Sequence, residues 1–258
     1  MGFKCGLVGM PNVGKSSIFN LLTAQKIPAN NYPFCTIDPN IAYVKVSDER
    51  LDILADINKS KNIVNTSIEF VDIAGLIKGA SKGEGLGNEF LSHINNTDVI
   101  AHVVRFFEDK EILHVKENYT PLEDFQDINL ELILSDLSST EKYLERLKKS
   151  RFDIKNKEKL SNELKHLTEH LSNDKFASSF NFSKELSLCN DFKLLTTKPM
   201  FVIANINNQS NPDEIKQFSE EIDSDIKIIT IDVKLEQDIS ELDESEEKEF
   251  LNELGYEE

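Results

Sequence analysis

The sequence lacks the features of a membrane or secreted protein. It contains no run of about 18 apolar residues, which argues against an ordinary membrane-spanning helix. Its first residues, MGFKCGLVG, lack the basic and small-residue signals of a secretory leader. The cysteines, Cys5, Cys35 and Cys189, are far apart and have no partners at metal-ligand spacing, so neither a disulfide framework nor a zinc site is predicted. We therefore expect a cytoplasmic protein with reduced thiols and no membrane partner.

Positive charge is also scarce overall. The formal net charge is -17, which argues against a protein that coats nucleic acid by bulk attraction, because that mode needs clustered Lys and Arg. The charge is uneven along the chain. Residues 236–258 contain eleven Asp or Glu and one Lys, whereas residues 142–165 are rich in Lys. The distribution is compatible with a basic arm on an acidic body.

The order of apolar segments predicts the fold class. Short apolar segments at residues 3–8, 41–46, 68–71, 98–107, 201–204 and 226–231 are typical of strands, and residues 16–24 have helical spacing. Strands that alternate with helices indicate an α/β fold with a mainly parallel sheet covered on both faces. A chain of 258 residues is long enough for one such domain, or for a core that carries a smaller insertion.

The pattern changes between residues 121 and 198. Long polar stretches carry leucines at helical spacing, for example Leu160, Leu164, Leu167 and Leu171, and two antiparallel helices fit this pattern best. The alternative is an ordinary helical cover on the sheet. We predict a projecting helical insertion at residues 121–198, between the two parts of a core domain at residues 1–120 and 199–258.

A phosphate-binding motif lies near the start of the sequence. Residues 9–16, GMPNVGKS, match G-x-x-x-x-G-K-[ST] between a predicted strand and a predicted helix, which is the context that this motif requires. Backbone N–H groups of such a loop surround phosphates, Lys15 would neutralise the β and γ phosphates, and Ser16 would offer its hydroxyl to Mg²⁺. The predicted nucleotide-binding residues here are Asn12, Val13, Gly14, Lys15, Ser16 and Ser17, with Lys15 also expected to act in catalysis.

Two further elements indicate a switch around that loop. Residues 68–75, IEFVDIAG, end an apolar strand in D-x-x-G, so Asp72 would hold Mg²⁺ through a water and the Gly75 N–H would sense the γ-phosphate. The following residues 78–87 are glycine-rich. Thr36 lies between the first helix and the second strand, where it would ligate Mg²⁺ only when a triphosphate is bound; the alternative is a surface turn. The predicted metal ligands are Ser16, Thr36 and Asp72.

Several stretches together resemble one family. MGFKCGLVGMPNVGKSSIFNLLT, NYPFCTIDPN, EFVDIAGLIKGASKGEGLGNEFL, HVVRFFED and DISELDESEEKEFLNELG are similar to the YchF (Obg-like) ATPases, a branch of the translation-factor-related P-loop proteins. The resemblance runs through residues 1–258. It implies a nucleotide-binding domain interrupted by a coiled-coil-like helical domain, association with the ribosome, and hydrolysis of ATP rather than GTP. Family members continue into a C-terminal TGS domain, and the sequence as given ends before that region.

The residues expected to act in hydrolysis differ from those of Ras-like proteins. Leu76 stands where those proteins use a glutamine to position water, and a hydrophobic side chain cannot polarise water. The resemblance implies His114 as a substitute, since an imidazole can orient water or accept its proton; from the sequence alone a lone histidine on a loop can equally be incidental. Asn12 resembles an asparagine that related proteins use to hold K⁺ beside the phosphates.

The base-recognition segment departs from the family pattern. GTP-specific relatives have N-K-x-D here and the YchF family has N-x-x-E, whereas this chain has Asn205, Ile206, Asn207 and Asn208. The neutral amide of Asn208 carries a donor and an acceptor, so it cannot form the charged fork that binds guanine. The predicted base-site residues are Asn205, Ile206 and Asn208, with ATP preferred over GTP.

These observations favour a monomeric, ribosome-associated, Mg²⁺-dependent ATPase that switches between two shapes and turns over slowly without a partner. Two alternatives stay open. One is a GTPase. The other is a nucleotide-gated binding module whose hydrolysis is negligible because of Leu76.

Overall fold

The architecture is taken from a computed structural model of the chain. It describes residues 2–24, 40–73, 86–109, 112, 114, 119–149, 154–187 and 192–253. Thr36, Gly75 and Leu76, together with the glycine-rich residues up to 85, lie outside the described residues. Within the described ranges no helix is both long enough and apolar enough to cross a membrane.

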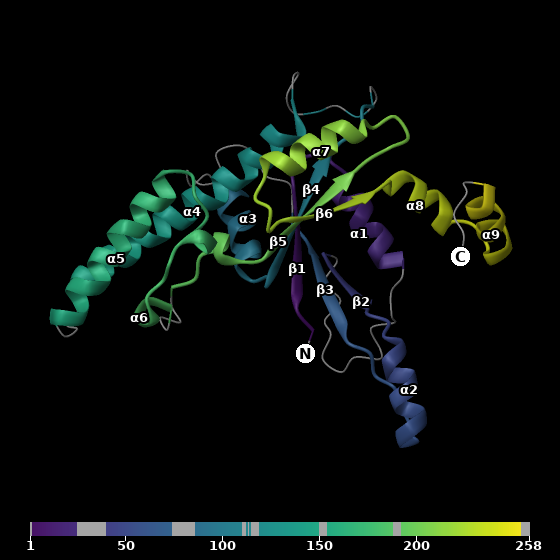
Figure 1. Cartoon of the computed structure of the whole chain (residues 1–258), viewed down its shortest axis with the longest axis horizontal. Coiled ribbons are helices and arrows are strands. Elements are labelled where there is room, and N and C mark those ends of the chain that lie inside the picture. The colour runs from purple at the N-terminus through teal and green to yellow at the C-terminus, as the bar shows by residue number, and fades with distance from the viewer. Residues whose placement is uncertain are drawn as a thin grey trace.

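The centre of the molecule is a six-stranded sheet in the order β2-β3-β1-β4-β5-β6 (Figure 1). Only β2 runs antiparallel to its neighbour, and the other four strand pairs are parallel, which confirms the mainly parallel sheet predicted from the sequence. The strands are β1 (Lys4–Val8), β2 (Ile41–Lys45), β3 (Ser67–Asp72), β4 (Val99–Arg105), β5 (Met200–Asn205) and β6 (Lys227–Ile231).

Helices connect the strands, and several of them pack on the sheet. They are α1 (Lys15–Ala24), α2 (Glu49–Asn58), α3 (Leu86–Asn95), α4 (Pro121–Lys149), α5 (Ile154–Ser172), α6 (Lys184–Ser187), α7 (Pro212–Glu221), α8 (Val233–Ser240) and α9 (Glu244–Glu253), with 3-10 turns η3 (Ala177–Ser179) and η4 (Leu195–Thr197). Capping side chains define several starts: Asp48 accepts from Arg50 N at α2, and Asn211 accepts from Asp213 N at α7.

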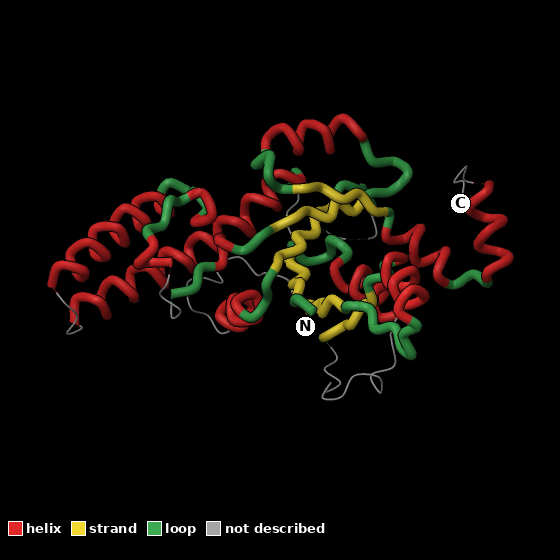
Figure 2. The backbone as a smooth tube through the Cα atoms, turned by 60° about the horizontal axis from the view of Figure 1, so that its bottom comes forward, coloured by secondary structure: helices red, strands yellow, loops and turns green. Residues whose placement is uncertain are grey.

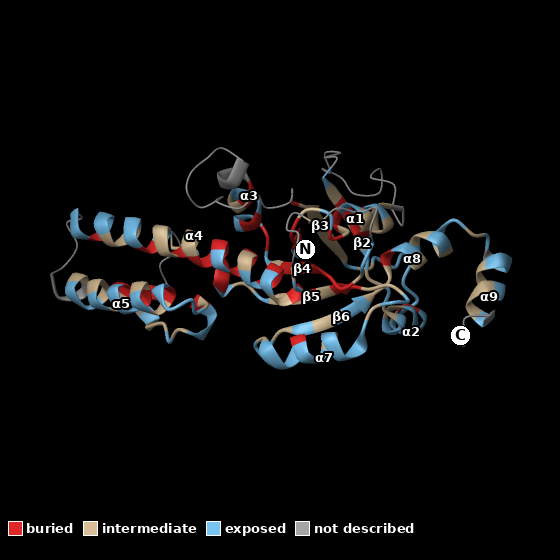
Figure 3. Ribbon diagram, turned by 90° about the horizontal axis from the view of Figure 1, so that it is seen from above, coloured by how far each residue is buried: buried red, intermediate tan, exposed pale blue. Residues whose placement is uncertain are grey.

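The core lies around the central strands. One cluster of buried apolar side chains joins β1 and β4 to α1 and α3, and a second joins β4 and β5 to Phe125 of α4 and Phe218 of α7. Figure 3 shows buried residues concentrated in the strands and in the part of α4 next to the sheet. These contacts fix the carboxyl ends of β1, β3 and β5 relative to one another, and the phosphate loop follows the first of these strands.

The two long helices α4 and α5 form an arm between β4 and β5. They run side by side away from the sheet (Figures 1 and 2) and bury Leu164, Leu167 and Leu171 of α5, the leucines whose spacing predicts a helix. The root of α4 belongs to the core, because Ile128 and Leu132 pack in the same cluster as β1. A domain boundary at residue 121 stays a prediction, and these contacts favour placing the projecting part of the arm further along α4.

Buried polar contacts fasten the arm to the core. Asp136 of α4 is 1% exposed and accepts hydrogen bonds from Leu195 N (2.7 Å), Thr196 N (2.8 Å) and Thr196 Oγ1 (2.7 Å) in η4. Two residues later, the Lys198 ammonium donates to the carbonyls of Ile94 and Asn95 at 2.8 Å each and to that of Thr97. Lys198 therefore satisfies carbonyls at the C-terminal end of α3, where a cation is favourable.

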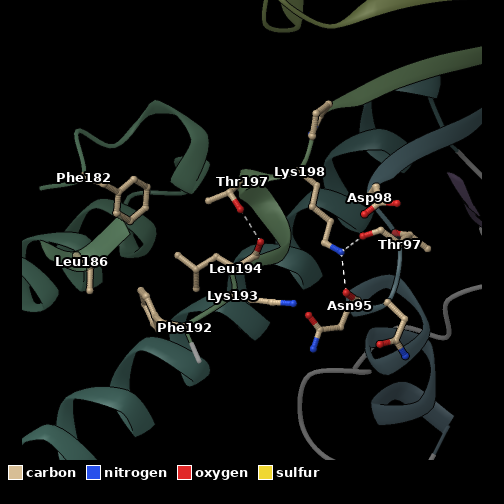
Figure 4. Close-up of a pocket in the computed structure, with 12 residues that line it drawn as sticks. Asn95, Thr97, Asp98, Phe182, Leu186, Phe192, Lys193, Leu194, Thr197 and Lys198 are labelled. Atoms are coloured by element: carbon tan, nitrogen blue, oxygen red, sulfur yellow. Dashed lines mark hydrogen bonds between the residues drawn. The ribbon is translucent and has the colours of Figure 1, made fainter. Parts of the chain in front are cut away.

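A cavity of about 600 Å³ lies beside this attachment. Figure 4 shows Phe182, Leu186 and Phe192 of the arm on one side and Asn95, Thr97 and Asp98 of the core on the other. Lys198 lies between the two groups, with its bonds to the α3 end visible as dashed lines. The cavity marks where the arm and the core meet.

Candidate functional site

The glycine-rich loop joins β1 to α1, as the motif predicts. β1 ends at Val8 and α1 begins at Lys15, so the loop spans residues 9–14. Asn12 has φ 63° and Gly14 has φ 101°, both in the left-handed region that a tight anion-binding turn uses. The first N–H groups of α1 have no partner within the helix, and this end of the helix favours negative charge. The local structure is that of a phosphate cradle.

Lys15 is buried at the start of α1. Its side chain is 6% exposed, and Nζ donates to the Gly9 carbonyl at 2.9 Å and to the Met10 carbonyl at 2.8 Å. Burial lowers the pKa of Lys15 to about 8, while the carboxylate of Asp72 acts in the opposite direction. The loop therefore holds a cation that has lost much of its hydration and that an incoming anion would stabilise.

Asp72 lies next to this cation. It is the last residue of β3 and pairs in register with Leu7 of β1. Burial raises the pKa of Asp72, and the Lys15 charge and a hydrogen bond from the Ser16 hydroxyl lower it. Ser16 and Asp72 thus bring a hydroxyl and a carboxylate together, and hard oxygen donors of this kind suit Mg²⁺. Thr36, the third predicted metal ligand, lies outside the described residues, which contain no cluster of three or more His, Cys, Asp or Glu suited to a metal.

Asn205 connects the phosphate loop to the start of α8, which follows the edge strand β6. It ends β5, is 4% exposed, and donates from Nδ2 to the Val13 carbonyl at 2.9 Å. Its Oδ1 accepts from Val233 N at 3.4 Å, at the start of α8. A Cβ on Gly14 would lie 2.3 Å from Asn205 Nδ2, so glycine is required at this position both for its φ and for this close approach.

We expect Gly14→Ala to destabilise the fold by about 1–3 kcal/mol, because alanine is strained at this φ and its methyl group would displace the Asn205 amide. Urea unfolding of the nucleotide-free protein measures the loss. The Asn205→Ala background separates the two causes, since removal of the amide should reduce the cost of Gly14→Ala by relieving the clash. An equal cost in both backgrounds would contradict the steric part of the prediction.

A cavity of about 880 Å³ contains this loop. It is lined by the loop residues Asn12, Gly14, Lys15, Ser16 and Ser17 and by Asn205, Ile206 and Asn208, all of them predicted nucleotide-binding residues. Val13, also predicted, is 1% exposed and contributes its carbonyl to Asn205. Gly75 lies outside the described residues. The structure therefore brings the described members of the predicted phosphate and base segments to one cavity, with Val13 behind its wall.

The cavity has further walls that the sequence reasoning missed. They are formed by Phe107, Asp109 and Ile112 after β4, and by Asn207, Asp232, Val233, Lys234, Leu235, Gln237 and Asp238 near or after the ends of β5 and β6. Ligands of open α/β sheets bind at the carboxyl ends of the strands, and this rule applied to the predicted strands at residues 98–107 and 226–231 could have found them.

Hydrogen bonds in the loop after β5 leave Asn208 at the cavity surface. Asn207 Oδ1 accepts from Gln209 N at 3.0 Å and from Ser210 Oγ at 3.1 Å, so this side chain closes the turn. Ser210 Oγ also lies 2.8 Å from the Phe106 carbonyl, so its single proton serves these two acceptors. Asn208 is exposed and lines the cavity. Its amide is therefore placed to meet a ligand, whereas that of Asn207 is used within the loop.

His114 lies beside the root of α4. Its Nε2 is 2.7 Å from Asp124 Oδ2, both side chains are nearly fully buried, and its ring stacks on Tyr119 with centroids 3.6 Å apart. The preceding segment is held by buried Arg105, which donates to the carbonyls of Phe107, Asp109 and Ile112. His114 is not among the residues that line the cavity. Its predicted catalytic role would therefore require it to leave this pair.

These features define a P-loop nucleoside triphosphatase. They are a glycine-rich loop between β1 and α1, a buried lysine at the end of that loop, and an aspartate that ends the neighbouring strand. The family described as 50S ribosome-binding GTPase matches residues 4–149. The chain belongs to the YchF family of these proteins, as its relatives show. The Ribosome-binding ATPase YchF of Pasteurella multocida is 45% identical over all of this chain and 72% of its own length, and that of Bacillus subtilis is 42% identical over all of this chain and 73% of its own length.

A solved structure supports the same assignment. The YchF GTPase of Schizosaccharomyces pombe is 35% identical and superposes with a TM-score of 0.80 over 99% of this chain and 72% of its own. The fold, with a mainly parallel sheet interrupted by helices, is therefore the predicted one. The names of these relatives differ in the nucleotide, since the bacterial proteins are called ATPases and the yeast protein a GTPase.

Proposed function

We propose that this chain is a ribosome-associated, Mg²⁺-dependent switch that binds and slowly hydrolyses ATP. The observation that carries the proposal is that Lys15 and Ser16, with Asp72 beside them, line the same cavity as Asn205 and Asn208. The names of the bacterial relatives, which are called ribosome-binding ATPases, point the same way.

At the phosphate end, each residue has a role that follows from its chemistry. The backbone N–H groups of residues 12–17 would surround the phosphates, and Lys15 would exchange its two carbonyl partners for β and γ oxygens. Ser16, Asp72 and Thr36 would hold Mg²⁺, which supplies positive charge to the phosphate oxygens. Gly75 would sense the γ-phosphate, and Asn12 would hold K⁺ beside it.

At the base end, Asn205, Ile206 and Asn208 would read adenine. Competitive titration calorimetry with ATP, GTP and ADP in the presence of Mg²⁺ tests this choice, and tighter binding of GTP than of ATP would replace the ATPase proposal with a GTPase. A protein that binds none of the three would remove the whole proposal.

We expect Asn208→Glu to sharpen the preference for ATP by about tenfold, because a carboxylate here restores the N-x-x-E pattern and accepts more strongly than an amide. The ratio of the ATP and GTP dissociation constants measures the effect. The neighbouring exposed Gln209→Glu adds the same charge outside the cavity lining and serves as the control. An equal gain in both variants would show that charge alone is responsible.

For hydrolysis, we expect His114→Ala to lower the rate constant for phosphate release by about 100-fold, as loss of a general base does. Release is measured with and without ribosomes, because the wild-type rate alone should be low. Binding of ATP should change little, since His114 does not line the cavity. A variant that releases phosphate as fast as wild type would contradict the catalytic role of His114.

The buried position of His114 against Asp124 favours one alternative, a nucleotide-gated binding module with negligible hydrolysis. In that case ATP acts as a ligand that changes the shape of the protein and is not consumed. Absence of phosphate release from wild type under every condition, together with retained ATP binding, would establish this alternative.

Association with the ribosome is supported by charge on the arm. In an acidic chain, the outer parts of α4 and α5 carry exposed cations at Lys142, Arg146, Lys148, Lys149, Lys159 and Lys165. A basic surface of this kind can neutralise RNA phosphates. The protein would act as a cytoplasmic monomer, and co-sedimentation with ribosomes at rising salt, with and without ATP, tests the partner.

A further inference from the structure

Asp232 places a carboxylate at the base end of the nucleotide cavity. It directly follows β6 and lines the cavity together with Asn205 and Asn208. Its position is fixed through its neighbour, because Val233 N donates to Asn205 Oδ1 at 3.4 Å and Asn205 Nδ2 in turn holds the Val13 carbonyl at 2.9 Å. Asp232 is therefore connected by two hydrogen bonds and one peptide unit to the loop that would hold the phosphates.

Only one of the two Asp232 oxygens is committed within the fold. Oδ1 accepts the Leu235 N–H at 3.0 Å and so caps the start of α8. Oδ2 accepts no hydrogen bond from the described residues, and the side chain is partly exposed at the cavity wall. Oδ2 thus keeps its full acceptor capacity for a ligand, whereas Oδ1 is oriented by the Leu235 N–H, and a carboxylate can only accept.

The number of neighbouring donor groups distinguishes the two purines. Guanine presents two neighbouring donor groups, N1–H and N2–H₂, which match a carboxylate that offers both oxygens. Adenine presents one exocyclic amine, N6–H₂, beside the acceptor N1. One oxygen of Asp232 matches the single amine of adenine, and both Asp232 and exposed Asn208 line the cavity.

We propose that Asp232 determines base specificity by accepting a hydrogen bond at Oδ2 from the N6 amine of adenine. The inference rests on the proposed function, that this cavity binds a nucleoside triphosphate. Residue 208 is an asparagine in this chain and has no carboxylate, so Asp232 would supply the carboxylate that accepts from the base. A guanine in the same position would bring its O6 acceptor against the carboxylate, so the same residue would disfavour GTP.

The test combines Asp232→Asn with removal of single amines from the ligand. Asparagine is as good a helix cap as aspartate, so the variant should fold, and its amide oxygen can cap α8 while an NH₂ donor replaces Oδ2. Affinities are measured for ATP and for purine riboside triphosphate, which is ATP without the N6 amine, and for GTP and ITP, which differ by the N2 amine.

We expect the substitution to weaken ATP binding about tenfold, as loss of a hydrogen bond to a charged group does. Binding of purine riboside triphosphate should change less than about twofold, and GTP should bind as well as before or better. Asp243→Asn is the matched control: Asp243 caps α9 by accepting from Ser245 N and Glu246 N, and it does not line the cavity. This control should leave all four affinities unchanged.

Three results would overturn the inference. One is an equal loss for ATP and purine riboside triphosphate; another is a loss for GTP that exceeds the loss for ITP, since the acceptor would then read guanine. The third is unchanged ATP binding in Asp232→Asn. Failure of the proposed function is a different result, in which the wild-type protein binds none of the four nucleotides.

Discussion

Replacing Lys15 with methionine is expected to weaken ATP binding by at least about 100-fold. Methionine retains most of the apolar stem but removes the ammonium, and with it two charge-assisted hydrogen bonds to phosphate, each contributing about 1.5–3 kcal/mol. ADP should lose less, because the γ-phosphate contact is absent from it. Titration calorimetry with both nucleotides gives the two ratios.

The control for Lys15→Met is its stability against unfolding in the absence of nucleotide. Lys15 is buried with its charge, and burial is the main cause that lowers its pKa, so removing the charge should not destabilise the empty protein. A variant that binds ATP within about threefold of wild type would contradict the role of Lys15, provided that its thermal unfolding is unchanged.

Proton uptake supplies a second measurement on the same residue. With a pKa of about 8 in the nucleotide-free protein, Lys15 is largely protonated at pH 7 and largely neutral at pH 9. Bound phosphates favour the charged form, so ATP binding above pH 8 must take up a proton, and affinity should fall by up to about tenfold per pH unit there. Calorimetry in buffers of different ionisation enthalpy should show this uptake in wild type and not in Lys15→Met.

Replacing Asp136 with alanine is expected to lower the free energy of unfolding by about 3–5 kcal/mol, the largest stability effect that we predict for a single side chain. The substitution removes the acceptor for three donors of Leu195 and Thr196, all at 2.7–2.8 Å and in buried residues. Buried donors left without an acceptor cost about 1–3 kcal/mol each when they cannot reach water. Urea unfolding provides the measurement.

Glu141→Ala is the matched control for this prediction. Glu141 lies on the same helix but is exposed, so its removal should change stability by less than about 0.5 kcal/mol. A loss below about 1 kcal/mol for Asp136→Ala would show that water or a shift of η4 satisfies the donors, and that the arm is held chiefly by its apolar contacts.

The sequence was sufficient for the sheet and for the phosphate end of the site. Apolar strands and the G-x-x-x-x-G-K-S loop are local patterns, and each is interpretable from consecutive residues. The end of β3 was predictable for the same reason, since Asp72 follows a largely apolar strand. Local chemistry determined these parts, and the structure agrees on the sheet, on the loop that joins β1 to α1 and on the place of Asp72 at the end of β3.

Contacts between distant segments were not predictable in this way. The pairing of His114 with Asp124 and the stacking on Tyr119 depend on how the chain after β4 folds back on α4. No local motif marks Asp232 as a base-site residue; the strand that it follows was predictable, but its place beside Asn205 depends on the order of β5 and β6 and on the Asn205 bridge. The packing of the root of α4 on the sheet likewise has no signature in the leucine spacing, which predicts a helix but not its neighbours.

The continuity of α4 has a mechanical consequence. Its 29 residues form a rod about 43 Å long at 1.5 Å per residue, with one end packed in the sheet and the other at the tip of the arm. Any rotation of the embedded end is magnified along this lever, and a tilt of about 5° would move the tip by roughly 4 Å. Displacements too small to disturb the core would therefore still reposition the cationic tip by the length of a hydrogen-bonded contact.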